Sequence, residues 1–346
     1  MKNFKTISAI FSLLIYCNSV MSGSNWKGQQ PQISVDGKGI IRVVFGRNDS
    51  IFCFTSLGGE NFSNESLVGV VPEMHLGMAR GPQLASSTNI SLITAMNKKG
   101  NIHYFILDVR KGNKWNDKGI INDHGSTAPE GLMNIAADEG DNFYAVWLDT
   151  RIGKTNNIFF SSFSSKNKKW SANSLVYKSP DTHVCECCRP SIAVKGSKIA
   201  IMFRNWVNGS RDLYLCESGN IGLKFSAAQK LGSGTWKLNG CPMDGGSLIY
   251  DGTNTISTTW RRKDMIYYCL LGKSEIEVAK GRDCSISQNK GTILISYTQN
   301  GNVLYKDMRT NLETIVGKGS YLKTKIINDK ILCVWENDNQ IKIKMI

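Results

Sequence analysis

Short runs in which hydrophobic and polar residues alternate recur along almost the whole chain, and most of them come in pairs. Seven pairs are joined by connections containing Asn, Gly or Asp, as in Ile40–Gly46 with Ile51–Thr55. Alternation with a period of two predicts strands, and a short polar connection predicts a hairpin. A single extended run, such as Gln83–Ser86, lies between successive hairpins. The pattern therefore predicts an all-β protein with almost no helix.

An aromatic residue follows a turn at nearly constant intervals along the first two thirds of the chain. These residues are Phe62, Trp115, Trp170 and Phe225, separated by 53, 55 and 55 positions. A fixed period of this size is typical of propellers and solenoids. We therefore predict a β-propeller of four-stranded antiparallel blades, with seven blades favoured and six as the alternative. The last unit lacks a fourth strand, which residues 23–30 are expected to supply, closing the ring and removing exposed edges.

The turns before all four aromatic residues resemble the Asp-box, S-x-D-x-G-x-T-W, of the sialidase (neuraminidase) superfamily. The best-formed copy is Ser218-Gly-Asn-Ile-Gly222-Leu-Lys-Phe225, and the Asp position is taken by Leu57, Arg110, Ser165 and Asn220 in the four turns. The resemblance implies a propeller that hydrolyses sialylated or similar acidic glycans. It also implies three arginines that bind the sugar carboxylate, an Asp acid/base and a Tyr–Glu nucleophile pair. Sialidases have six blades, so a count of seven departs from the family.

The first 22 residues have the composition of a secretory signal peptide. Lys2 and Lys5 precede the apolar run Ile7–Tyr16, and small residues lead up to a cleavage site after Ser22. We expect residues 23–346 to form a single propeller domain that is secreted or periplasmic. A lipid anchor on Cys17 is the less favoured alternative. No other segment approaches the roughly 18 apolar residues of a membrane span, so no transmembrane segment is expected.

The chain carries a net charge of +14, mostly from lysine. No base-stacking or helical recognition motif accompanies this charge, so a nucleic-acid partner is not expected. An acidic glycan or another anionic small ligand is the expected partner of an exported basic protein. We expect a monomer that needs no cofactor.

Nine of the twelve arginines fall in the connections that the predicted blades bring to one face. Arginine offers a planar fork that binds a carboxylate or a sulfate through two hydrogen bonds. About half of these arginines are expected to pair with neighbouring Asp residues instead. The predicted substrate-binding residues are Arg80, Arg151, Arg189, Arg204, Arg211 and Arg261.

The resemblance to sialidases implies an arginine triad, for which the candidates are Arg80, Arg204 and Arg261. We expect these three side chains to converge on one ligand carboxylate. Glu130, Asp149 and Asp244 are candidate catalytic acids, because glycoside hydrolysis needs a carboxyl group with a raised pKa near the scissile oxygen. The distinctive loops contain no tyrosine, so the sequence identifies no nucleophile.

The most specific local feature is a cysteine cluster. Cys185, Cys187 and Cys188 lie in one predicted loop, and Cys241 lies in the loop of the next blade. A disulfide between two of them is favoured, because exported proteins form disulfides. A thiolate site for copper or zinc, together with His183, is one alternative, and free reactive thiols are another. Packing residues of the core are expected at Cys53, Cys216, Cys269 and Cys333.

The sequence therefore supports two readings. The first is a secreted, sialidase-like glycoside hydrolase that acts on acidic glycans. The second is a non-catalytic propeller that binds an anionic carbohydrate or a protein partner through the same arginine-rich face. The fold alone does not separate them, because propellers host many functions.

Overall fold

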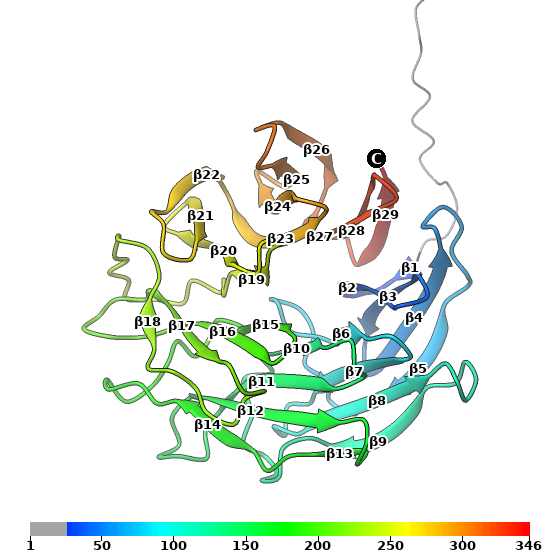
Figure 1. The fold of residues 1–346 in the computed structure, drawn as a ribbon, viewed down its shortest axis with the longest axis horizontal. Helices are drawn as coiled ribbons and strands as arrows, with labels where there is room; N and C mark the ends of the chain where they lie inside the picture. The colour runs from blue at the N-terminus through cyan, green and yellow to red at the C-terminus, as the bar shows by residue number, and fades with distance from the viewer. Residues whose placement is uncertain (1–25) are drawn as a thin grey trace, which may run out of the picture.

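The computed structural model describes residues 26–346, so the predicted signal peptide and Cys17 lie outside the described residues. The described chain forms seven antiparallel sheets arranged in a ring (Figure 1), and it contains no helix. This confirms the β-propeller and the favoured count of seven blades over six. Within residues 26–346 we find no segment of helix that could span a membrane.

Each blade has four strand positions, counted outward from the axis of the ring. The first strands are β2 (Gln29–Val35), β6 (Gln83–Ser86), β10 (Met133–Ala137), β15 (Ser191–Lys195), β19 (Ser247–Tyr250), β23 (Arg282–Asn289) and β27 (Ser320–Ile327). The second strands are β3 (Ile40–Arg47), β7 (Ile90–Met96), β11 (Phe143–Asp149), β16 (Lys198–Arg204), β20 (Ile256–Arg262), β24 (Thr292–Gln299) and β28 (Lys330–Asn337).

The outer half of each blade completes the sheet. The third strands are β4 (Ser50–Leu57), β8 (Ile102–Asp108), β12 (Asn157–Ser164), β17 (Leu213–Ser218), β21 (Met265–Leu270), β25 (Asn302–Asp307) and β29 (Gln340–Met345). The fourth strands are β5 (Ser66–Val70), β9 (Asn116–Ile120), the divided pair β13 (Lys169–Trp170) and β14 (Ser174–Tyr177), β18 (Gln229–Lys230), β22 (Ile276–Lys280), β26 (Glu313–Lys318) and β1 (Trp26–Lys27).

The ring is closed by the first strand of the described chain. Strand β1 pairs antiparallel with β29, with Trp26 opposite Ile341 and Lys27 opposite Gln340. The blue and red ends of the chain therefore meet in Figure 1. Trp26 also stacks on Phe54 of the neighbouring blade, with ring centroids 4.3 Å apart. Within the predicted segment 23–30, Trp26 and Lys27 complete the last blade, whereas Gln29 and Gln30 belong to β2 of the first blade.

The hydrophobic core lies between the blades rather than at one centre. Every residue of β7 and β11 is buried, because each second strand is covered on both faces by neighbouring sheets. Strand β9, at the rim, is exposed along its whole length. The four cysteines predicted to pack in the core are buried as expected: Cys53, Cys216, Cys269 and Cys333.

The turn that resembles the Asp-box locks one blade onto the next. The Ser218 hydroxyl accepts a hydrogen bond from the Gly222 amide at 3.0 Å and lies 2.8 Å from the Asn220 side-chain oxygen. Gly222 has φ +87°, and a Cβ there would lie 2.4 Å from the ring of Phe160. Phe225 then packs edge-on against Phe160 at 5.2 Å. The recurring aromatic position therefore serves packing between blades.

Antiparallel pairing sorts the connections into two ends of the ring. Turns between second and third strands, and loops from each fourth strand to the next first strand, meet at one end. We call this end the loop face. It carries all of the residues that the sequence predicts for a site, whereas the turns between third and fourth strands lie at the opposite end.

Candidate functional site

A cleft of about 530 Å³ opens on the loop face near the axis. Its walls come from loops far apart in sequence, and the lining residues are Gln29, Asn48, Asp49, Met74, His75, Leu76, Met78, Arg80, Lys98, Pro129, Glu130 and Met243. Two predicted site residues, Arg80 and Glu130, therefore meet in one cleft. Met243 reaches it from the connection between β18 and β19.

A tight turn presents Arg80 to this cleft. Met78 and Ala79 both have positive φ, at 52° and 65°, and the Arg80 amide donates to the Gly77 carbonyl at 3.0 Å. Two consecutive non-glycine residues in this region are strained. Arg80 Nε donates to the Glu130 carbonyl at 2.5 Å, and its Nη2 lies 3.6 Å from the Glu130 carboxylate. Neither Nη1 nor Nη2 makes a hydrogen bond to another residue within 26–346, and the Arg80 side chain lines the cleft.

His75 borders the same cleft and was not singled out by the sequence. Its ring packs against Gly131, where a Cβ would come within 2.4 Å. Burial is the main cause that lowers the pKa of His75, and Nε2 finds no hydrogen-bond partner within the described residues. The cleft therefore contains a neutral imidazole with an unused polar atom.

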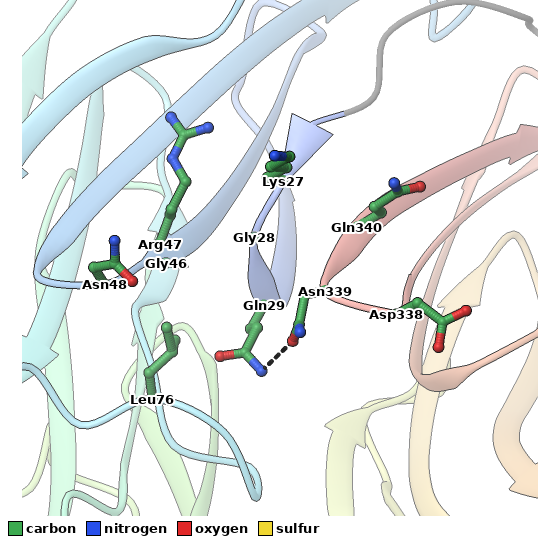
Figure 2. A pocket seen from close by; sticks show the side chains of 10 residues that line it. All are labelled: Lys27, Gly28, Gln29, Gly46, Arg47, Asn48, Leu76, Asp338, Asn339 and Gln340. Carbon is green, nitrogen blue, oxygen red and sulfur yellow. Dashed lines mark hydrogen bonds between the residues drawn. The ribbon is translucent and has the colours of Figure 1, made fainter.

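A second cleft of about 500 Å³ adjoins the first, because the two share Gln29, Asn48 and Leu76. It runs along the seam where β1 closes the ring. Figure 2 shows Gln29 turned toward Asn339, and the Gln29 amide donates to the Asn339 side-chain oxygen at 2.7 Å. Side-chain amides supply both donors and acceptors, as sugar hydroxyls require. The two clefts together form a trough from the axis to this seam.

A group of charged side chains lies at the axis, near the start of the first strands. Arg189 precedes β15, and its Nη1 donates to Gln83 Oε1 of β6 at 3.1 Å. The backbone amide of Asp283, in β23, donates a hydrogen bond to the Asp244 carboxylate at 2.9 Å. Burial, followed by the charge of Asp244, raises the pKa of Asp283 to about 6, and nearby cations oppose this. Burial, followed by the charge of Arg189, lowers the pKa of Lys323 to about 7.

Tyr321 lies beside this axial group. Burial is the main cause that raises the pKa of its hydroxyl. The negative charges of Asp283 and Glu336 raise this pKa further, and the positive charge of Arg282 lowers it. Tyr321 has φ +58°, and Glu336 accepts a hydrogen bond from the Gln30 amide at 2.9 Å. Sequence reasoning missed this tyrosine, because the connection before β27 is a single residue, Gly319, and was not recognised as a loop.

Asp149 is fully buried and forms part of the frame of the loop face. Its carboxylate accepts hydrogen bonds from Trp147 Nε1 at 2.8 Å and from the Thr127 hydroxyl at 2.9 Å. Arg151 binds it through Nε at 2.9 Å and Nη2 at 2.8 Å, and also reaches Asp123 at 2.6 Å. Every acceptor position is occupied, so we assign Asp149 and Arg151 to holding loops together rather than to catalysis or substrate binding.

Arg204 is also structural. Its side chain is 1% exposed and donates four hydrogen bonds to backbone carbonyls. Two go to Asp244 at 3.0 and 2.9 Å, one to Arg211 at 2.7 Å and one to Arg261 at 2.8 Å. Arg204 is not among the residues that line the trough. This placement corrects the expectation that Arg204 joins Arg80 in binding a ligand carboxylate.

Two further predicted arginines are mostly engaged within the protein. Arg211 donates to Cys185 Sγ at 3.0 Å and to the Glu186 carboxylate at 3.2 Å. Arg261 donates to the Pro242 carbonyl at 2.9 Å, and its Nε lies 3.5 Å from Asp244. Of the six predicted substrate-binding arginines, Arg80 lines the cleft, and Arg189 is buried and donates to Gln83.

The cysteine cluster is well defined. Cys185, Cys187 and Cys188 are buried, with sulfur–sulfur distances of 3.7 Å from Cys185 to Cys187 and 3.3 Å from Cys185 to Cys188. All three are free thiols, as is Cys241, which is exposed and lies outside the cluster. His183 is not part of it either, because its Nδ1 lies 2.8 Å from the Val184 carbonyl. The predicted disulfide stays a prediction.

No protein-family model matches the chain, and no curated relative matches its sequence. Solved structures match its fold. One is a polysaccharide lyase, an ulvan lyase bound to -[GlcA(1-4)Rha3S]-, with 9% identity, a TM-score of 0.58, and coverage of 92% of this chain and 94% of that chain. Another is the fucose-recognising lectin of Aleuria aurantia, a six-bladed β-propeller, with 12% identity, a TM-score of 0.56, and coverage of 86% and 98%.

At these identities the matches show the β-propeller fold alone. The chain is thus a seven-bladed propeller whose structural neighbours include a polysaccharide lyase and a fucose lectin. The resemblance to sialidases stays a prediction.

Proposed function

We propose that this protein binds an anionic saccharide in the trough on the loop face. The observation that carries the proposal is the trough itself, two adjoining clefts of about 530 and 500 Å³. Amides line it together with four cations, Lys27, Arg47, Arg80 and Lys98, and three carboxylates, Asp49, Glu130 and Asp338. Structural neighbours of this fold include proteins solved with saccharides. Export, which the first 22 residues predict, would place the trough among extracellular glycans.

The chemistry of the trough fits a sugar that bears a carboxylate or a sulfate. Amides of Gln29, Asn48 and Asn339 offer donors and acceptors to ring hydroxyls. Arg80 offers a free guanidinium nitrogen to an anionic substituent, and Arg189 and Lys323 add positive charge at the axial end. The overall charge of +14 favours the approach of a polyanion at low ionic strength.

Calorimetric titration with matched oligosaccharides tests the proposal. Oligosaccharides with uronate or sulfate groups should bind, and neutral ones of the same length should bind more weakly. Arg80→Ala should weaken binding roughly 10–100-fold, the value of one charge-assisted hydrogen bond. Arg309→Ala is the matched control, because Arg309 is an exposed arginine in the turn between β25 and β26 at the opposite end of the ring. Equal affinity for charged and neutral sugars would contradict the proposal.

Hydrolysis of the bound saccharide, as in a sialidase, is a second candidate function. It is favoured by Asp283, whose pKa of about 6 suits a general acid near neutral pH. Tyr321 and Glu336 lie beside it and are available as a nucleophile pair of the kind that the sialidase resemblance implies. Among the predicted acids, Glu130 lines the cleft and Asp244 contacts Asp283.

Incubation with sialylated and other acidic glycans, followed by measurement of released sugar, tests this second candidate. Asp283→Asn should lower turnover by about 100-fold or more while binding persists, because general acid catalysis contributes on that order. Binding with no release from any glycan would leave the first proposal standing and exclude hydrolysis of those glycans.

A further inference from the structure

The buried cysteine cluster is more than a candidate for disulfide formation. Cys185, Cys187 and Cys188 lie in the connection between β14 and β15, and their relative exposures are 0%, 6% and 1%. Their three sulfur atoms all lie within 4.8 Å of one another. Three thiols brought together in the interior form a ready donor set for a soft metal ion.

A fourth sulfur comes from a different loop. Met243, in the connection between β18 and β19, packs directly against the three cysteines. Its side chain is half-buried and also lines the axial cleft. The thioether is a soft ligand as well, and the group of three thiols that it packs against contains no carboxylate or imidazole.

The spacing of the sulfurs suits one shared ion. Sulfur ligands about 2.3 Å from a common ion lie about 3.8–4.0 Å from one another in tetrahedral or trigonal geometry. The observed 3.3 and 3.7 Å spacings from Cys185 come within about 0.5 Å of this range without any change of backbone. A disulfide needs sulfurs about 2.05 Å apart and would remove two of the three donors.

Positive side chains beside the cluster offset part of its charge. Three thiolates around a monovalent ion leave two negative charges in excess, and buried charges need partners. Arg211 supplies one positive charge, with Nη1 at 3.0 Å from Cys185 Sγ, and it also meets the half-exposed Glu186. Arg204, fully buried in the same loops, supplies the second and acts electrostatically on Cys185 and Cys188.

We propose that Cys185, Cys187, Cys188 and Met243 bind one Cu(I) ion at the loop face. Thiolate and thioether ligands select Cu(I), and the buried position excludes the water that harder ions retain. Coordination releases the thiol protons to solvent and involves no change in the oxidation state of the metal. The proposal is independent of saccharide binding.

The test uses the full mature chain, reduced and kept free of oxygen, titrated with Cu(I) against a chromophoric Cu(I) chelator. We expect one tightly held equivalent per chain and sulfur-only coordination by X-ray absorption. Cys187→Ser and Cys188→Ser should each weaken Cu(I) binding more than about 100-fold, since even outer-sphere changes cost 10–100-fold. Met243→Leu preserves the shape of the side chain and should change the sulfur coordination number while the protein stays folded.

Cys241→Ser is the matched control, because Cys241 is exposed in the loop of Met243 and lies outside the cluster. It should leave the Cu(I) stoichiometry unchanged, and thermal unfolding checks that each variant is folded. Three results would overturn the proposal: undiminished Cu(I) binding by both folded cysteine variants, failure of the reduced chain to bind Cu(I), or one bound zinc ion that Cu(I) does not displace.

Discussion

Truncation of Arg204 should destabilise the propeller rather than merely weaken ligand binding. The guanidinium donates four hydrogen bonds to three backbone carbonyl groups, those of Arg211, Asp244 and Arg261. Arg204→Ala leaves those three carbonyl oxygens unpaired, at about 1–3 kcal/mol for each buried group. Water that enters the space offsets part of this cost. We therefore expect the free energy of unfolding to fall by about 3–5 kcal/mol, as for other broken buried charge networks.

Urea unfolding followed by tryptophan fluorescence measures this loss directly. In a domain of this size each kcal/mol lowers the melting temperature by about 2 °C, so a fall of at least about 6 °C is expected. Arg204→Lys should lie between wild type and Arg204→Ala, because an ammonium group can satisfy only some of the carbonyls. Arg309→Ala, at an exposed position, should change stability by less than about 0.5 kcal/mol.

The refuting result is specific. If Arg204→Ala keeps the wild-type unfolding midpoint and loses saccharide affinity tenfold or more, Arg204 faces a ligand and its assignment to the frame is wrong.

Two further predictions concern pH and backbone conformation. With pKa values of about 6 for Asp283 and about 7 for Lys323, the axis becomes less positive as pH rises, so affinity for an anionic saccharide should fall between about pH 5 and 8. Calorimetry across this range checks the trend, and Lys323→Met should flatten its upper part. Gly222→Ala should cost about 1–3 kcal/mol, because of its positive φ and the close Phe160 ring. Gly219→Ala, which meets no atom within 4 Å, should be nearly neutral in the same unfolding assay.

The fold could be predicted from the sequence because propeller blades repeat a local pattern. Paired alternating runs and the spacing from Phe62 to Phe225 gave the hairpins and the count of seven. The missing fourth strand of the last unit identified β1 as its completion. The alternating runs and the turns between them reflect local hydrophobicity and turn chemistry, which depend little on distant parts of the chain.

The site was harder to predict, because the direction of each side chain depends on contacts between blades. Arg80 and Arg204 occupy similar loops in the sequence, yet only Arg80 reaches the cleft. Arg204 lies where three carbonyls, from two loops and the end of β20, converge, which no local pattern reveals. Asp283 and Lys323 were missed for a related reason, because near the axis they look like ordinary positions of an alternating strand.

The seam between β1 and β29 has a consequence for how the molecule is made. The ribosome synthesises Trp26 before the six other blades, but its partner Ile341 belongs to β29 (Gln340–Met345), which is made after all of them. Closure of the circle must therefore wait until synthesis has passed β29, and six blades can assemble while both edges are still unpaired. Such open edges are the templates on which β-proteins aggregate. The stacking of Trp26 on Phe54 occurs beside this last join, so its fluorescence can report the moment of closure in a refolding or translation experiment.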